Sequence, residues 1–157
     1  MDIDAELSLV TLDGEFLGED QMEAPDGVDM GRYNEFSGAV TIYVDEEAFS
    51  IGDMMTYVVS QTCAAIPIQL KSEGQATYTG FSHDEDINFE LDGDKLKITG
   101  AYRQDLTVPA KPVLQALVKA GQRFARMLPT MWPDAPQDAV QQLSGQMQDA
   151  AVAIGLE

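Results

Sequence analysis

The sequence predicts an α+β fold: an antiparallel sheet with a buried helix after the early strands and two C-terminal helices packed on it. Segments rich in β-branched and aromatic residues lie on both sides of an apolar stretch at 51–66, which reads as a helix. The last third of the chain has helical apolar spacing. This order of elements is typical of α+β proteins. The 157 residues fit one domain, with an acidic sheet-rich half at 1–108 and a helical part at 109–157.

The N-terminal part predicts strands joined by an acidic loop. Residues 6–16 contain leucines near an Asp13-Gly14 turn, which indicates a first strand and a hairpin. Residues 18–31 hold five acids, one proline and three glycines without an apolar period, which indicates a loop. Residues 36–44, FSGAVTIYV, are β-branched and aromatic and predict a further strand.

A buried helix is expected after the acidic sequence Asp45-Glu46-Glu47. Ser50 is a candidate N-cap, with Asp53 three residues later in a capping-box arrangement. The segment 51–66 is apolar nearly all round, so we expect it to lie against the sheet. Pro67 is expected to end or kink this helix because proline has no N–H to donate.

Residues 87–98 predict a β-hairpin. Apolar and polar residues alternate before and after Asp92-Gly93-Asp94, so each strand has one apolar face. A two-residue loop, either Asp92-Gly93 or Gly93-Asp94, keeps the apolar residues of both strands on the same face. Lys95 and Lys97 then face Glu90 and Asp92 across the strands.

The remaining segments predict further strands and two helices. Residues 76–81 read as a strand that follows an exit from the helix at Gly74. The second hairpin strand is expected to run on through Tyr102 to Val108, with a break at Gly100. Pro109 or Pro112 can open the next helix, Pro129 is expected to stop it, and a last helix is expected from about Gln137.

The charge is concentrated in one half of the chain. Residues 1–94 carry 22 acids against Arg32 and Lys71, and residues 95–157 have a net charge of +2. Acid concentrated in this way attracts a basic partner and repels phosphates, so nucleic acid is not an expected partner. A basic stripe on the first C-terminal helix is either a solvated face or docks against the protein's own acids. Its members are Lys111, Lys119 and Arg126, with Arg123 beside it.

Composition also favours a cytoplasmic protein. Cys63 is the single cysteine, so no internal disulfide forms and a reducing compartment is expected. The N-terminus, MDIDAELSL, lacks the basic and apolar regions of a signal peptide. No apolar run reaches the length of a membrane span, so no membrane partner is expected.

No pattern of residues supports an enzyme. Ser82, His83 and Asp84 are adjacent, and adjacent strand residues point to opposite faces, so they cannot form a catalytic triad. A Cys63–His83 dyad is conceivable, but Cys63 is expected to pack inside the buried helix. One cysteine and one histidine make a poor zinc site, and no glycine-rich phosphate loop occurs. We therefore expect no catalysis, cofactor or bound metal.

Three acidic runs in loops or at strand ends are candidate partner-binding segments. Loops at the ends of sheets commonly carry binding residues, and clustered carboxylates speed the encounter with a basic partner. Ordinary solvated loops are the alternative interpretation. Aromatic residues in or near these loops are candidate anchors, namely Tyr33, Phe36, Phe81 and Trp132. The predicted partner-binding residues are Glu19, Asp20, Glu23, Asp26, Asp29, Asp45, Glu46, Glu47, Asp84, Glu85, Asp86 and Trp132.

Residues 37–98 resemble small acidic immunity proteins of bacterial polymorphic toxin systems. The resemblance lies in SGAVTIYVDEEAFSIGDMMTYVVSQTCAAI followed by TYTGFSHDEDINFELDGDKLKI, a pattern of strand, acidic turn, apolar helix and hairpin. It covers about half of the chain. It implies a protein that neutralises a cognate toxin inside the producing cell, and many such toxins are basic.

Two other functional classes stay open at this point. An acidic secretion chaperone or adaptor would hold a segment of an effector protein in an apolar groove. An enzyme would use Cys63 and His83. A homo-oligomer is possible, but the sequence does not indicate one.

We predict that the segment 84–95 does not bind calcium tightly. Asp84, Asp86 and Asn88 alternate like the first ligands of an EF-hand loop, but its sixth position is Phe89 instead of glycine and its twelfth is Lys95 instead of glutamate. Titration calorimetry should detect no micromolar binding. Such binding, lost in Asp84→Ala, would contradict the prediction.

Overall fold

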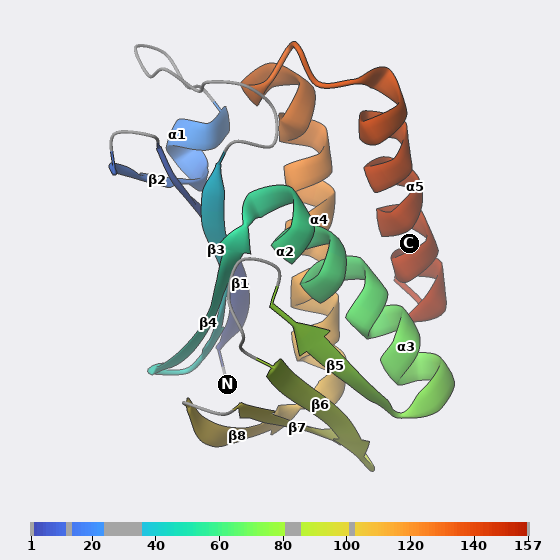
Figure 1. Ribbon diagram of the computed structural model, residues 1–157. Helices are drawn as coiled ribbons and strands as arrows, with labels where there is room; N and C mark the ends of the chain where they lie inside the picture. Colours follow the sequence, from blue (N-terminus) through green and yellow to red (C-terminus); the bar gives the residue numbers. More distant parts are fainter. Residues whose placement is uncertain (1, 12–13, 24–35, 81–85, 101–102, 157) are drawn as a thin grey trace.

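A computed structural model describes residues 2–11, 14–23, 36–80, 86–100 and 103–156. Within these residues it confirms an α+β architecture with antiparallel strands and two long C-terminal helices (Figure 1). The strands form two four-stranded sheets instead of one. The first, here called sheet A, has the order β2-β1-β3-β4, and the second, sheet B, has the order β5-β6-β7-β8.

Sheet A contains the N-terminal strands. A hairpin joins its first two strands, as predicted, and Gly14 in that turn has a φ of +86°, which suits glycine. A five-residue helix, α1, follows in the segment predicted to be a loop. The elements are β1 (Ile3–Val10), β2 (Phe16–Gly18), α1 (Glu19–Glu23), β3 (Ser37–Val44) and β4 (Glu47–Met54).

The helix predicted from Ser50 was wrong in its first turn. Residues 47–54 form β4, and Ser50 lies opposite Thr41 of β3, with 2.8 Å between the two hydroxyl oxygens. Apolar residues alternate with small or polar ones along this strand, and a period of two indicates a strand whose two faces differ. Asp53 therefore does not cap a helix. Its side chain points inward and accepts a 2.5 Å hydrogen bond from Tyr78, which links the two sheets.

The buried helix begins at Met55 and is continuous to Glu73. It consists of α2 (Met55–Ser60), a π-helical turn η1 (Gln61–Ala65) and α3 (Ile66–Glu73). Pro67 does not end it, because the proline lies in the first turn of α3, directly after the wide π turn, where a missing N–H is tolerated. The helix ends at Gly74, as predicted, with a left-handed φ of +78°.

Sheet B confirms the predicted hairpin. Leu91 pairs with Leu96, and Asp92 pairs with Lys95, which leaves Gly93-Asp94 as the two-residue loop. The next segment does not extend the same strand, because the chain reverses after Gly100 and returns antiparallel. The strands are β5 (Gln75–Thr79), β6 (Asp86–Asp92), β7 (Lys95–Gly100) and β8 (Arg103–Pro109).

Two helices complete the chain, α4 (Ala110–Met131) and α5 (Gln137–Ala153). Pro109 opens α4, in agreement with the sequence, but Pro129 lies inside the helix instead of ending it. The helix continues for two more residues because Trp132 fixes its end. The Trp132 N–H donates to the Leu128 carbonyl at 2.9 Å, and the ring packs between Phe36 and Phe124. No helix in the described part of the chain is long and apolar enough to cross a membrane.

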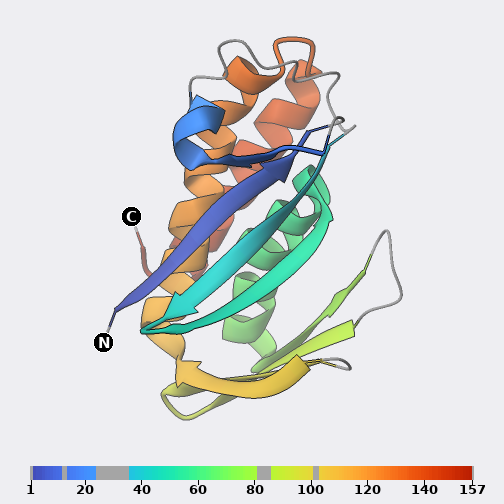
Figure 2. The same ribbon diagram turned by 90° about the vertical axis from the view of Figure 1, so that its left-hand side faces the viewer.

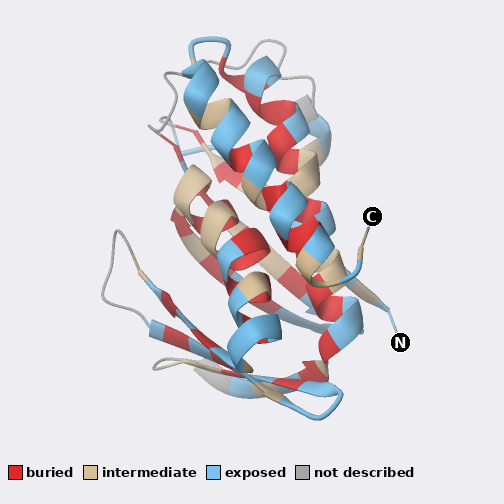
Figure 3. Ribbon diagram, turned by 90° about the vertical axis from the view of Figure 1, so that its right-hand side faces the viewer, coloured by how far each residue is buried: buried red, intermediate tan, exposed pale blue. Residues whose placement is uncertain are grey.

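The core lies where α4 crosses the buried helix, between sheet A and α5 (Figures 1 and 3). Gly121 of α4 permits this close approach. A Cβ atom built on Gly121 would lie 2.6 Å from the Cβ of Cys63 and would also collide with Met147 of α5. Residue 121 therefore has to be glycine for three helices to meet at this distance.

We predict opposite effects for two glycine-to-alanine changes in the C-terminal helices. Gly121→Ala should lower the free energy of unfolding by about 1–3 kcal/mol, because the new methyl overpacks the helix contact. Gly145→Ala should raise it by about 0.5–1 kcal/mol, because residue 145 lies in a helix with no heavy atom near its missing Cβ. Urea unfolding measures both. Equal effects would contradict the proposed helix contact.

Candidate functional site

The outward face of sheet A is the surface best suited to a protein partner. Alternate residues of β1, namely Ala5, Leu7 and Leu9, point inward and are buried. The residues between them, including the exposed Asp4 and Glu6, point outward. Figure 2 shows this face of the sheet in front of the helices, which cover the opposite face. We call this outward surface the acidic face.

Exposed carboxylates stand on the acidic face. Asp4 lies opposite Tyr43, and Glu6 lies opposite Thr41, whose other neighbour is Ser50. Carboxylates two residues apart on a strand are about 6.8 Å apart along it, so their negative charges add in attracting a base. Both acids are exposed.

Two exposed aromatic side chains border the same face. Phe16 of β2 is 76% exposed and lies opposite Val10 of β1. Tyr43 of β3 is 37% exposed and lies at the other end, beside Asp4. Exposed aromatic rings are the side chains that most often anchor a partner in a protein interface. The face therefore combines charge for attraction with apolar area for contact.

One of the predicted acidic runs adjoins this face. Asp45 and Glu46 are exposed in the turn between β3 and β4, and Glu47 is exposed as the first residue of β4. Asp45 has a left-handed φ of 54°, and its carboxylate accepts a hydrogen bond from the Asp2 N–H at 2.9 Å. Its own N–H donates to the Asp2 carbonyl at 2.7 Å. These bonds hold the turn beside the start of β1, so Asp45 and Glu46 adjoin the acidic face, whereas Glu47 is on the same side of β4 as the buried Phe49.

The predicted site residue Glu19 is engaged inside the protein. Its carboxylate lies 2.7 Å from Nε of Arg123 in α4 and also accepts from the Leu7 N–H at 3.3 Å. Arg123 donates further to the Ala5 carbonyl at 2.8 Å. The hydrogen bond with Glu19 is the main cause that raises the pKa of Arg123. Glu19 thus fixes α4 to sheet A through Arg123, the base that lies beside the basic stripe.

Next to this ion pair, an open hollow of about 540 Å³ lies between β1, α1 and β3. Glu6, Thr41 and Tyr43 line it from the sheet, and Asp20 lines it from α1. Asp20 is exposed. This hollow lies within the acidic face, and it can receive a long basic side chain.

Trp132 is corrected as a partner-binding residue. It was expected in an exposed loop, but it is only 1% exposed, because its ring packs 5.5 Å from Phe36 and 6.3 Å from Phe124, measured between centroids. Phe36 is buried as well. Both rings therefore belong to the core.

The other predicted site residues do not join the acidic face in the described structure. Asp86 is exposed at the start of β6, in sheet B. Glu23 is the last residue of α1, and the structure describes only its backbone. Several predicted residues lie outside the described residues: Asp26, Asp29, Tyr33, Phe81, His83, Asp84 and Glu85.

Sequence reasoning missed Asp4, Glu6, Phe16 and Tyr43. The signal for the two acids was present, because acidic and apolar residues alternate in the first seven residues, MDIDAEL. The emphasis on acidic runs in loops overlooked acids spaced along a strand. The exposure of the two aromatic residues could not be read from the sequence, because it depends on which face of the sheet the helices cover.

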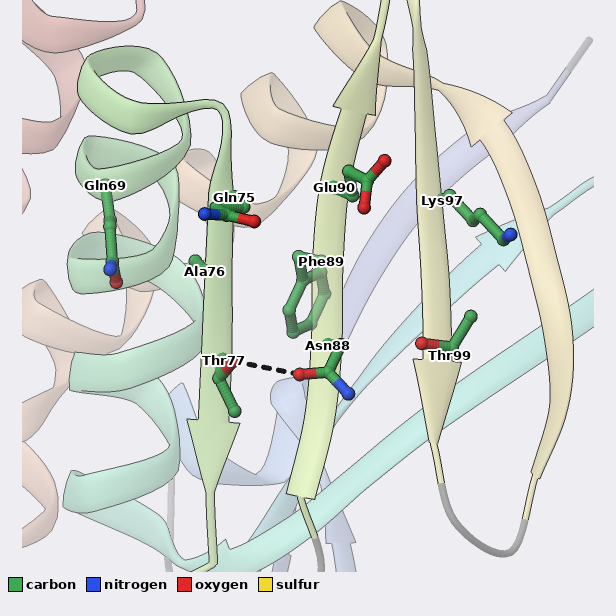
Figure 4. A pocket seen from close by; sticks show the side chains of 9 residues that line it. All are labelled: Gln69, Gln75, Ala76, Thr77, Asn88, Phe89, Glu90, Lys97 and Thr99. Atoms are coloured by element: carbon green, nitrogen blue, oxygen red, sulfur yellow. Dashed lines mark hydrogen bonds between the residues drawn. The ribbon is translucent and has the colours of Figure 1, made fainter.

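A second hollow, of about 510 Å³, lies on sheet B and has a different character (Figure 4). Thr77 donates to the Asn88 side chain at 2.9 Å across β5 and β6. Glu90 lies opposite Lys97 on the neighbouring strand, so the two charges cancel. This hollow is polar and close to neutral, and it offers less attraction for a basic partner than the acidic face.

Cys63 is fully buried in the π turn of the central helix. Burial raises the pKa of its thiol from 9.0 to about 12, against a smaller lowering by the hydrogen bond with Thr62. A thiol with such a pKa stays protonated near neutral pH and is a poor nucleophile. This environment is typical of a cysteine that serves as a small apolar side chain in the core.

Compared with protein families, curated proteins and solved structures, the chain matches none. Among the described residues, no three His, Cys, Asp or Glu side chains lie close enough together to hold a metal ion. The interpretation of the acidic face therefore rests on its geometry.

We predict that Cys63→Ala lowers the free energy of unfolding by about 1 kcal/mol at pH 7, because the variant leaves a small cavity where the thiol was. This difference between the two proteins should shrink above pH 9. The unfolded thiol ionises above about pH 9, whereas the folded thiol does so only near 12, so wild-type stability falls as pH rises between these values. Between these values, the free energy of unfolding of the wild type should fall by up to about 1.4 kcal/mol per pH unit relative to that of the variant.

Urea unfolding of both proteins at pH 7, 9 and 10, under reducing conditions, measures this difference. Parallel pH profiles would contradict the assigned thiol pKa. Rapid alkylation of the native thiol by iodoacetamide would contradict its burial.

Proposed function

We propose that this protein is an immunity-type inhibitor, which binds and neutralises a basic toxin or effector enzyme through its acidic face. The observation that carries the proposal is a sheet face with carboxylates in its middle and exposed aromatic rings at its ends. The helices pack on the opposite face, so they leave this one open. Residues 37–98, which carry the resemblance to immunity proteins, supply β3, β4 and the acidic turn of this surface.

The acids and the aromatic residues have different tasks in this proposal. Asp4, Glu6 and the 45–47 turn attract the partner at a distance and raise the rate of encounter. Tyr43 and Phe16 lose water on docking and slow dissociation. The inhibitor would act inside the producing cell, by covering a basic surface that the toxin needs for its own activity.

A secretion chaperone or adaptor is the second candidate. It is favoured by one observation, a groove lined partly by apolar side chains between α4 and α5. The two candidates differ in the state of the partner. An inhibitor co-purifies with a folded basic enzyme, whereas a chaperone co-purifies with an unfolded segment. Affinity purification from the native host, with mass spectrometry and limited proteolysis of the captured protein, distinguishes them.

We predict that removing charge from the acidic face slows association with the captured partner. Asp4→Asn with Glu6→Gln, or Asp45→Asn with Glu46→Gln and Glu47→Gln, should lower the on-rate by about tenfold at low salt. Near 1 M salt the screening length is about 3 Å, so the difference from wild type should vanish. Tyr43→Ala should mainly raise the off-rate.

Stopped-flow association across ionic strength measures these rates. Asp138→Asn with Asp149→Asn is the matched control, because it removes two exposed acids from α5, away from sheet A. An on-rate that does not change with salt contradicts electrostatic steering. Equal slowing by the control and by the β1 double variant contradicts the acidic face as the docking surface.

A further inference from the structure

A groove of about 660 Å³ runs between α4 and α5. Figure 3 shows the two helices side by side, with buried and exposed residues alternating along them. Ala125, Met147, Ala151 and Val152 supply the apolar part of the lining, and of these only Val152 is exposed, since the other three are buried. Val152 is 74% exposed, which is unusual for a large apolar side chain beside a core.

The groove residues of α5 follow helical spacing. Residues 144, 147, 148, 151 and 152 are separated by three, one, three and one positions, so they share one face of the helix. Alanine and serine at three lining positions have short side chains, which leaves a channel between the helices. A third helix packs into such a channel at about 8–10 Å from each neighbour.

The rim of this groove on the α4 side is basic. Arg126 lines the groove, and Lys119 and Lys111 are exposed further towards the start of α4. Each base is seven or eight residues from the next, which is about 11 Å along the helix axis. Within the described residues, none of these three side chains has an ion-pair partner. Arg123 of the same helix is neutralised by Glu19, on the side that faces sheet A.

The acids of α5 do not neutralise this rim. Asp138 and Asp149 are exposed on α5, but neither lines the groove. The chain has a net charge of −18, yet the residues that line the groove include one base, Arg126, and no acid. At physiological ionic strength the screening length is about 8 Å, so a bound group responds most to the charges beside the groove.

We propose that the α4–α5 groove is a second docking site, which takes an acidic amphipathic helix of a partner protein. The apolar side chains of that helix, at positions i, i+3, i+4 and i+7, lie over Met147, Ala151 and Val152. Its carboxylates lie beside Arg126 and along the basic stripe of α4. This site is separate from the acidic face, and it attracts the opposite charge.

The binding test uses three labelled synthetic peptides of 18 residues. The first has leucines on one face and glutamates beside them, the second has lysines in place of the glutamates, and the third is the first with its order scrambled. Fluorescence anisotropy should show that the first binds at least tenfold more tightly than the other two. Equal binding of the first two peptides, or no binding of the first at millimolar protein, overturns the proposal.

Two variants locate the site. Arg126→Glu and Val152→Asp should each weaken binding of the first peptide at least tenfold, and both positions are exposed, so folding is retained. Lys71→Glu on α3 is the matched control for Arg126→Glu, since it changes the net charge equally at an exposed site outside the groove. Phe16→Asp on sheet A is the control for Val152→Asp.

Equal weakening by a variant and its control shows a general charge effect and overturns the site. Peptide-induced NMR shifts confined to residues of sheet A overturn it as well. Sedimentation of the free protein tests the competing occupant, a second copy of the chain. A dimer that Val152→Asp dissociates would assign the groove to self-association instead of a partner helix.

Discussion

The close contact between α4 and the buried central helix is the constraint on which the rest of the structure depends. Gly121 allows the two helices to approach until the backbone of α4 lies against Cys63, and Met147 of α5 fills the space beside them. Where the three helices meet, α4 and the central helix cover the inner face of sheet A, and α5 packs on those two helices. A side chain at residue 121 would push these helices apart.

The open outer face of sheet A follows from that packing. With the long helices on one side of the sheet, the outward residues of β1 and β3 remain accessible, and they include Asp4, Glu6 and Tyr43. The ion pair between Glu19 and Arg123 fixes the edge of the same sheet to α4. Glu19, which was predicted to bind a partner, thus holds the fold together, and Asp4 and Glu6 remain exposed along β1.

The two sides of the molecule therefore differ in charge. The side formed by sheet A carries acids with aromatic rings, and the side formed by α4 and α5 carries bases beside an apolar groove. Arg123 of α4 lies between them and interacts with Glu19 and Asp4 on the side of sheet A. The two proposed docking sites therefore call for partners of opposite charge.

The sequence by itself determined the local features whose signal lies within a few residues. The 87–98 hairpin, its two-residue loop and the helix exit at Gly74 follow from alternation and from glycine, and all three were predicted correctly. Only the tertiary structure decided that Trp132 is buried between Phe36 and Phe124 and that Glu19 binds a residue 104 positions away. These outcomes depend on which surfaces meet after folding, and local sequence does not specify contacts between distant segments.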